Sequence, residues 1–82
     1  MLKKYFLSID QGTTSSKVML YNTKFKTIDS VQKELKQFFP NNGWVEHDAL
    51  QIWIDVKNLI KNILKKNKIK TSQILSIGIA NQ

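Results

Sequence analysis

Cysteine and arginine are absent from this sequence, and histidine occurs only once, as His47. Without cysteine the chain can form neither disulfides nor thiolate metal sites, and one histidine cannot supply a zinc site built from several imidazoles. No segment approaches the roughly 20 consecutive apolar residues that a membrane-spanning helix needs. We therefore expect a cytoplasmic protein without a membrane span. At 82 residues, the chain forms at most one small domain with a marginal core.

The positive charge of the chain is carried by thirteen lysines, which give a formal net charge of +7. Basic chains often bind nucleic acid, but the planar guanidinium that forks onto phosphate and guanine is missing here. Aromatic residues are not interleaved with the lysines, as a base-stacking surface would require. The densest group lies at and beyond one expected helix end, where cations complement the helix dipole: Lys61, Lys65, Lys66, Lys68 and Lys70. The pattern favours a solvated face and no nucleic-acid partner.

The segment 10–16, DQGTTSS, places small hydroxyl residues around a glycine directly after an apolar run. Apolar residues alternate on both sides of it: Leu7, Ile9, Val18 and Leu20. Such alternation predicts two strands joined by a tight turn. A P-loop is excluded, because it needs a longer glycine loop that ends in Gly-Lys-Ser/Thr at the start of a helix.

The residue types in this turn suit a phosphate site. Gly12 permits positive φ and a close approach of the backbone to a ligand, and Asp10 can ligate a hard cation such as Mg²⁺. N–H and hydroxyl groups that can converge on phosphate oxygens come from Thr13, Thr14 and Ser15. Lys17 adds a positive charge within reach of a phosphate, and one orientation of Ser16 points into the sheet instead. The alternative is an ordinary tight turn capped by its Asp and Ser/Thr side chains.

The remaining pattern predicts four strands and one helix in the order β-β-β-α-β. The strands are expected at residues 4–10, 16–21, within 27–38 with a bulge near 30–33, and at 74–79. The helix begins after Asp48, which forms a capping-box pattern with Gln51, and it closes at Asn67 and Lys68. Its apolar stripe comprises Ile52, Trp53, Val56, Ile60, Ile63 and Leu64, and its opposite face carries Lys57, Lys61 and Lys65.

The helix should act as a crossover that places the last strand parallel to the first. It then covers one face of the sheet and leaves the other face bare, although the first and last strands are apolar on both sides. The sequence therefore predicts an α/β chain that is part of a larger fold.

Three segments carry a resemblance to a known family. Residues 10–16 resemble the first phosphate loop of the superfamily of sugar kinases, heat-shock proteins and actin, and Gln11 with the paired serines is similar to its glycerol kinases. Residues 39–53, with FP, GWVEHD and IW, and residues 77–82, IGIANQ, resemble two further glycerol kinase signatures. The resemblance implies that residues 1–82 are the N-terminal part of an incomplete ribonuclease-H-like (actin-like ATPase) domain, the first such domain of a carbohydrate kinase.

The same resemblance implies ATP-dependent phosphorylation of glycerol to sn-glycerol 3-phosphate, by an enzyme that is a homo-oligomer at full length. Asp10 would help to hold Mg²⁺, and Thr13 would also lie near the phosphate of the product. The residues that would bind the nucleotide phosphates are Gly12, Thr13, Thr14, Ser15 and Lys17.

Two departures from the family pattern leave alternatives open. Lys17 stands where glycerol kinases usually carry arginine and related sugar kinases use lysine, so another polyol or sugar kinase is one alternative. The resemblance matches no catalytic residue in this chain, so an inactive truncated remnant is the other. Glu46, His47 and Asp48 could form an acid–base cluster, but their place at a helix start favours a structural role.

Overall fold

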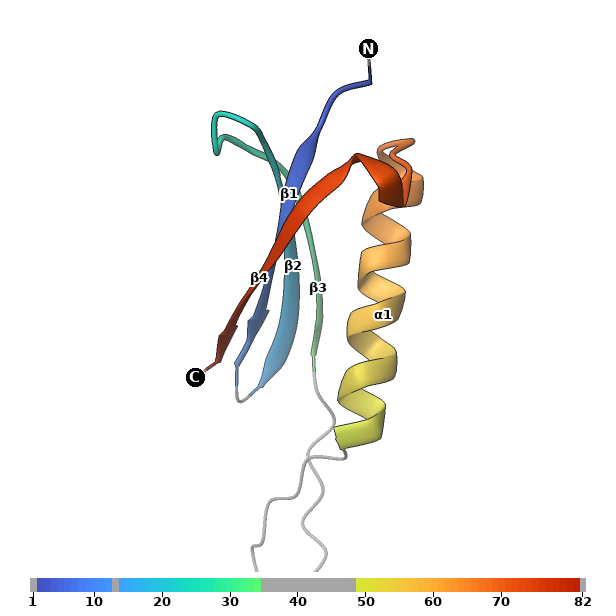
Figure 1. The fold of residues 1–82 in the computed structure, drawn as a ribbon. Helices are drawn as coiled ribbons and strands as arrows, with labels where there is room; N and C mark the ends of the chain where they lie inside the picture. Colours follow the sequence, from blue (N-terminus) through green and yellow to red (C-terminus); the bar gives the residue numbers. More distant parts are fainter. Residues whose placement is uncertain (1, 13, 35–48, 82) are drawn as a thin grey trace, which may run out of the picture.

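The expected order of elements is confirmed by a computed structural model that describes residues 2–12, 14–34 and 49–81. The elements are β1 (Tyr5–Gln11), β2 (Ser15–Asn22), β3 (Thr27–Glu34), α1 (Ala49–Lys66), the 3₁₀ turn η1 (Thr71–Gln73) and β4 (Ile74–Asn81). Three strands thus precede the helix and one follows it (Figure 1). The strand bounds match those expected from the apolar alternation to within a few residues, and η1 was not anticipated.

The four strands form one mixed sheet in the order β3-β2-β1-β4. β1 pairs antiparallel with β2, β2 pairs antiparallel with β3, and β4 runs parallel to β1. α1 lies along one face of this sheet and connects the edge strand β3 to the opposite edge strand β4 (Figure 1). The prediction of a crossover helix with a final strand parallel to the first is therefore confirmed.

The bulge between β2 and β3 lies at Ile28, so its expected position near residues 30–33 was wrong. Leu20 pairs with Asp29, but the next residue of β2, Tyr21, pairs with Thr27 and skips Ile28. The β2–β3 turn explains the shift. The side chain of Asn22 accepts hydrogen bonds from the backbone N–H groups of residues 24 and 26, and Phe25 has a φ of 61°. Turn geometry thus fixes the register at this end of the pair.

The helix ends where the sequence indicated. Lys68 has a left-handed backbone with φ of 56°, and the N–H of Ile69 donates to the carbonyl of Leu64 at 2.9 Å. A left-handed residue after the last turn is a common way for a helix to stop. The Asn67 side chain also donates to the Ile63 carbonyl at 2.8 Å, which satisfies one of the carbonyl groups at the helix end. The start of the helix at Asp48 and the capping box lie outside the described residues.

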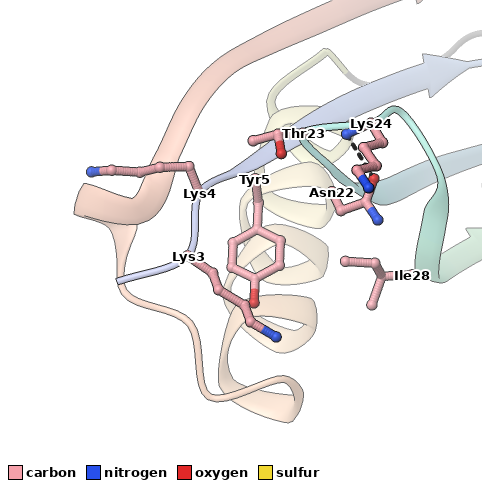
Figure 2. Close-up of a pocket in the computed structure, with 7 residues that line it drawn as sticks. All are labelled: Lys3, Lys4, Tyr5, Asn22, Thr23, Lys24 and Ile28. Atoms are coloured by element: carbon pink, nitrogen blue, oxygen red, sulfur yellow. Dashed lines mark hydrogen bonds between the residues drawn. The ribbon is translucent and has the colours of Figure 1, made fainter. Parts of the chain in front are cut away.

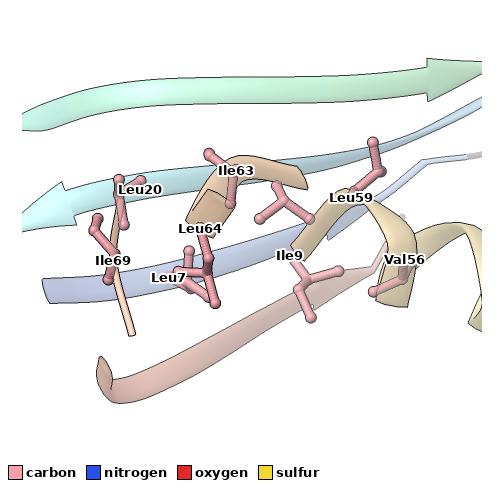
Figure 3. Close-up of a cluster of buried hydrophobic side chains, with 9 residues drawn as sticks. Leu7, Ile9, Leu20, Val56, Leu59, Ile63, Leu64 and Ile69 are labelled. Carbon is pink, nitrogen blue, oxygen red and sulfur yellow. The ribbon is translucent and has the colours of Figure 1, made fainter. Parts of the chain in front are cut away.

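The hydrophobic core lies between α1 and the sheet (Figure 3). Its buried members are Leu7, Ile9, Val18, Leu20, Val56, Leu59, Ile63, Leu64 and Ile69. The expected stripe on α1 is only partly confirmed, because Trp53 is 57% exposed and Leu59, which was not predicted, is buried. α1 packs mainly over β2 and β3, away from the β4 edge of the sheet, and the indole of Trp53 is left in solvent.

Apolar surface is also exposed on the helix side of the sheet, which the sequence did not suggest. Ile77 pairs with Leu7 and Ile79 pairs with Ile9, so the two β4 residues share the α1 face of the sheet. They are nevertheless 48% and 71% exposed. A groove of about 290 Å³ runs between α1 and β4 on this face. No helix in the described part of the chain covers the opposite face, as expected, and α1 leaves the β4 edge of its own face uncovered as well (Figure 1).

Candidate functional site

The segment 10–16 closes the β1–β2 hairpin, as expected from the flanking alternation. The last two pairs of the hairpin are Asp10 with Lys17 and Gln11 with Ser16. The Gly12 N–H donates to the Ser15 carbonyl at 2.9 Å and closes the turn. The structure thus brings together the predicted site residues Asp10, Gly12, Thr14, Ser15 and Lys17, and Thr13 lies outside the described residues.

The two charged residues of the site lie on the sheet face that α1 does not cover. Leu7 and Ile9 point into the core, so Asp10 points to the other side of β1. Lys17 is its cross-strand partner and shares that side, and both side chains are partly exposed. A carboxylate and an ammonium group are therefore presented side by side at the turn, accessible to a ligand.

Gln11 and Ser16 point the opposite way, into the core side of the hairpin. Ser16 is fully buried, and its Oγ donates to Oε1 of Gln11 at 2.7 Å. Nε2 of Gln11 donates to the carbonyl of Gly12 at 3.3 Å. The inward orientation of Ser16 that the sequence left open is therefore confirmed. This pair of contacts was not predicted, because only the strand register brings the two side chains together.

The turn lies at the end of the sheet where the parallel strands β1 and β4 finish (Figure 1). α1 begins at the same end of the molecule. Ligands of α/β proteins commonly bind beyond the carboxyl ends of parallel strands, and the candidate site has this position.

Asp10 belongs to no metal cage formed by the described residues. Among residues 2–12, 14–34 and 49–81, no group of three His, Cys, Asp or Glu side chains could hold a metal ion. Mg²⁺ bound with a nucleotide usually takes only one or two carboxylates and completes its shell with water and phosphate oxygens. A single carboxylate beside a phosphate-type turn fits this mode of binding.

A second hollow, of about 500 Å³, lies at the other end of the hairpin (Figure 2). It is lined by Lys3, Lys4, Tyr5, Asn22, Thr23, Lys24 and Ile28. The strand rise places Tyr5 about 20 Å from the turn, so this hollow is separate from the candidate phosphate site. The densest group of lysines in the sequence, which was expected near the end of the helix, is also separate from the site. Its members are exposed and lie at the end of α1 and just beyond it.

Two aspartates that the sequence did not mark attach α1 to the edge strand β3. Lys33 of β3 donates to the buried carboxylate of Asp55 in α1 at 2.9 Å. The Lys33 hydrogen bond, followed by one from Gln51, holds the pKa of Asp55 below its usual value. Asn67 and Lys66 approach Asp29 at 2.9 and 3.2 Å.

For Asp29, the side-chain hydrogen bond from Asn67 is the main cause of a lowered pKa, and the Ser30 N–H and Lys66 add to it. These two clusters position the helix and have no part in the hairpin site. The sequence could not reveal them, because their partners lie 22 and 38 positions apart.

Of the other residues considered from the sequence, the structure describes only Trp53. Glu46, His47 and Asp48 lie outside the described residues. The indole of Trp53 is largely exposed, and Nζ of Lys57 lies 5.8 Å from its ring centroid. No helix within the described part of the chain has the length and apolar character needed to cross a bilayer.

A mixed sheet in this order, with a hydroxyl-rich first hairpin and one crossover helix, is characteristic of the first part of an actin-like ATPase domain. The family model "FGGY family of carbohydrate kinases, N-terminal domain" matches residues 5–82. The chain belongs to the FGGY family of carbohydrate kinases.

Individual relatives agree with this assignment. The chain is 54% identical over all 82 residues to a glycerol kinase of Oceanobacillus iheyensis. Its structure is similar to a gluconate kinase from Lactobacillus acidophilus (TM-score 0.86, 30% identity, 99% of this chain). It is also similar to a Plasmodium falciparum glycerol kinase solved with ADP (TM-score 0.80, 33% identity, 98% of this chain). In each case the chain spans 16% of the relative's length.

Proposed function

We propose that the chain is the N-terminal part of an ATP-dependent glycerol kinase, within the first of its actin-like ATPase domains. The reaction would transfer the γ-phosphoryl group of ATP to a terminal hydroxyl of glycerol and give sn-glycerol 3-phosphate. The observation that carries the proposal is the 54% identity to a glycerol kinase along the whole chain, the hairpin turn included. Because ATP is abundant in the cytoplasm, we expect the enzyme to act there. The resemblance to glycerol kinases further implies a homo-oligomer at full length.

The hairpin turn supplies the phosphate site in this proposal. N–H and hydroxyl groups of Thr13, Thr14 and Ser15 bind the nucleotide phosphates, and Thr13 also lies near the product phosphate. Gly12 contributes by letting the backbone approach the phosphates closely, since its own N–H is bound to the Ser15 carbonyl. Lys17 adds a positive charge on the open face of the hairpin. Hydrogen-bond donors that are already in position before the reaction stabilise the charge on the transferring phosphoryl group without having to move. Such preorganised charge stabilisation is the main way in which kinases lower the barrier to phosphoryl transfer.

Asp10 is proposed to hold Mg²⁺ through one carboxylate, with water and phosphate oxygens completing the shell. The metal supplies charge neutralisation on the phosphates when it is bound. Asp10 itself orients and anchors the metal from the end of β1, next to the turn.

The second candidate function is that of a kinase of the same family that acts on another sugar or polyol. A gluconate kinase and a xylulose kinase from Lactobacillus acidophilus match the fold at TM-scores of 0.86 and 0.84, each at 30% identity. Lys17 also occupies the position where related sugar kinases use lysine. These observations favour a sugar or polyol kinase of the same family, whereas the higher identity to a glycerol kinase favours glycerol.

The experiment uses what we call the completed kinase. This is the whole 82-residue chain fused to the part of the Oceanobacillus iheyensis glycerol kinase that follows its matched segment. ATP-dependent phosphorylation of glycerol, gluconate and xylulose is measured with the purified fusion. Because most of the fusion comes from the relative, its turnover and acceptor preference are compared with those of the intact relative. Undiminished turnover with an unchanged preference for glycerol supports the proposal. A shift of preference towards gluconate or xylulose would favour the second candidate, and loss of all turnover would refute the proposed function.

A further inference from the structure

The inference concerns Gln11 and Ser16, the pair that lies behind the phosphate turn. Their side chains leave the hairpin on the α1 face, whereas Asp10 and Lys17 leave it on the open face. They therefore face away from the side that a nucleotide would occupy. Neither residue belongs to the set proposed above to bind phosphate.

Both polar groups of the Gln11 side-chain amide are hydrogen-bonded. Its Oε1 accepts a hydrogen bond from the Ser16 hydroxyl at 2.7 Å, and its Nε2 donates to the Gly12 carbonyl at 3.3 Å. One side chain thus ties the first residue of the turn to β2, the strand that leaves the turn. The Gly12 N–H is also bound, to the Ser15 carbonyl at 2.9 Å. Both backbone polar groups of Gly12 are therefore fixed.

The amide supplies both the acceptor and the donor that these two contacts need. A glutamate would accept from Ser16 but has no donor for the Gly12 carbonyl, and an aliphatic side chain makes neither bond. Ser16 is fully buried, so its hydroxyl has no water partner to replace Gln11. The two hydrogen bonds of Gln11 thus hold the turn in one conformation, and they need both the amide of Gln11 and the hydroxyl of Ser16.

We propose that Gln11 and Ser16 are positioning residues for phosphoryl transfer, which hold the turn at residues 12–15 in its phosphate-binding geometry without touching the nucleotide. This inference rests on the proposed function. Reaction rates depend steeply on such placement, because a displacement of about 1 Å in a group that binds the reacting centre can cost on the order of 10²-fold.

The test compares Gln11→Met, Ser16→Ala and the double variant in the completed kinase. Each single substitution is expected to lower kcat by on the order of tenfold, leaving KM for glycerol unchanged. The double variant should be no worse than the worse single variant, because the two side chains act as one unit. Ser8→Ala is the matched control. It removes a comparable hydrogen bond, from Ser8 to the Tyr21 hydroxyl at 3.2 Å, on the same hairpin but away from the turn.

Hydrogen exchange at the Gly12 amide supplies the second readout. Exchange should become about tenfold faster in Gln11→Met and Ser16→Ala and stay unchanged in Ser8→Ala. If kcat in the two variants matches that of Ser8→Ala, the pair is only structural and the inference is overturned.

The exchange measurement also separates this inference from the proposed function. A completed kinase without any activity would refute the proposed function. Unchanged Gly12 exchange would then refute the inference as well, and faster exchange would show that the pair fixes the turn.

Discussion

Asp10 on β1 and Lys17 on β2 are cross-strand partners on the face of the sheet that α1 leaves uncovered. They are the last outward-facing pair before the turn. The carboxylate that we propose holds Mg²⁺ and the ammonium group that we propose binds phosphate thus flank the turn. The first two predictions test these two residues separately.

Asp10→Asn should reduce kcat of the completed kinase by about 10²-fold, because the amide keeps the shape of the carboxylate but removes the charge that anchors Mg²⁺. Folding should be little affected, since Asp10 lies outside the core. The measurement is steady-state glycerol phosphorylation across a Mg²⁺ series, with Tm recorded for each protein. A variant with wild-type kinetics at every Mg²⁺ concentration would contradict the role of Asp10.

Lys17→Ala should raise KM for ATP by about tenfold, because one charge-assisted hydrogen bond to a phosphate is lost. Lys17→Arg is the matched variant and should keep KM for ATP close to that of the parent, since it preserves the charge and adds a fork. KM for ATP is measured at saturating glycerol. Equal values for Lys17→Ala and the parent would remove Lys17 from the phosphate site.

Asp55 should make the attachment of α1 to β3 pH-dependent. Lys33 and Gln51 lower its pKa in the folded state, so its stabilisation is complete above the unfolded pKa, about 4. The stabilisation is lost as the pH falls further, through the folded pKa. Asp55→Asn should therefore lower Tm at pH 7, and the deficit should shrink as the pH falls below the unfolded pKa, so it should be smaller at pH 3 than at pH 7.

Glu34→Gln is the control for this experiment, because Glu34 is an exposed carboxylate at the end of the same strand. Its Tm should follow that of the parent at both pH values. A Tm deficit in Asp55→Asn that is the same at pH 7 and pH 3 would show that the charge of Asp55 contributes nothing.

Ile63→Ala should destabilise the fold by about 2–5 kcal/mol, because the side chain is fully buried between α1 and the sheet. Trp53→Ala removes a larger side chain but should cost less than about 1 kcal/mol, since the indole is 57% exposed. Urea unfolding followed by circular dichroism compares the two variants. A larger loss for Trp53→Ala would mean that the helix packs with a different face.

The isolated 82-residue chain should form no sn-glycerol 3-phosphate, because the resemblance matches no catalytic residue in it. It should also aggregate, because Ile77 and Ile79 leave apolar surface exposed on the edge strand β4. Replacing both residues with lysine should lower light scattering at a given concentration. Lysine placed at the exposed residue Ser72 is the control for added charge and should have a smaller effect. Similar scattering in both proteins would locate the aggregation surface elsewhere.

The sequence alone determined the features that depend on local periodicity. Alternating apolar residues in 7–20 set the first hairpin and oriented Val18 and Leu20 inward. The three- and four-residue spacing in 52–64 set the helix and its lysine face. The same local pattern placed a turn rich in donors at residues 12–15, because strand alternation and glycine chemistry act between near neighbours.

Only the tertiary structure decided which surfaces these elements share. The position of α1 over β2 and β3 buried Leu59, exposed Trp53 and left Ile77 bare on the helix side. The strand register brought Gln11 to Ser16, and the helix–strand packing brought Lys33 to Asp55. Contacts of this kind depend on where whole elements lie relative to one another, and a periodic pattern along the chain carries no information about that placement.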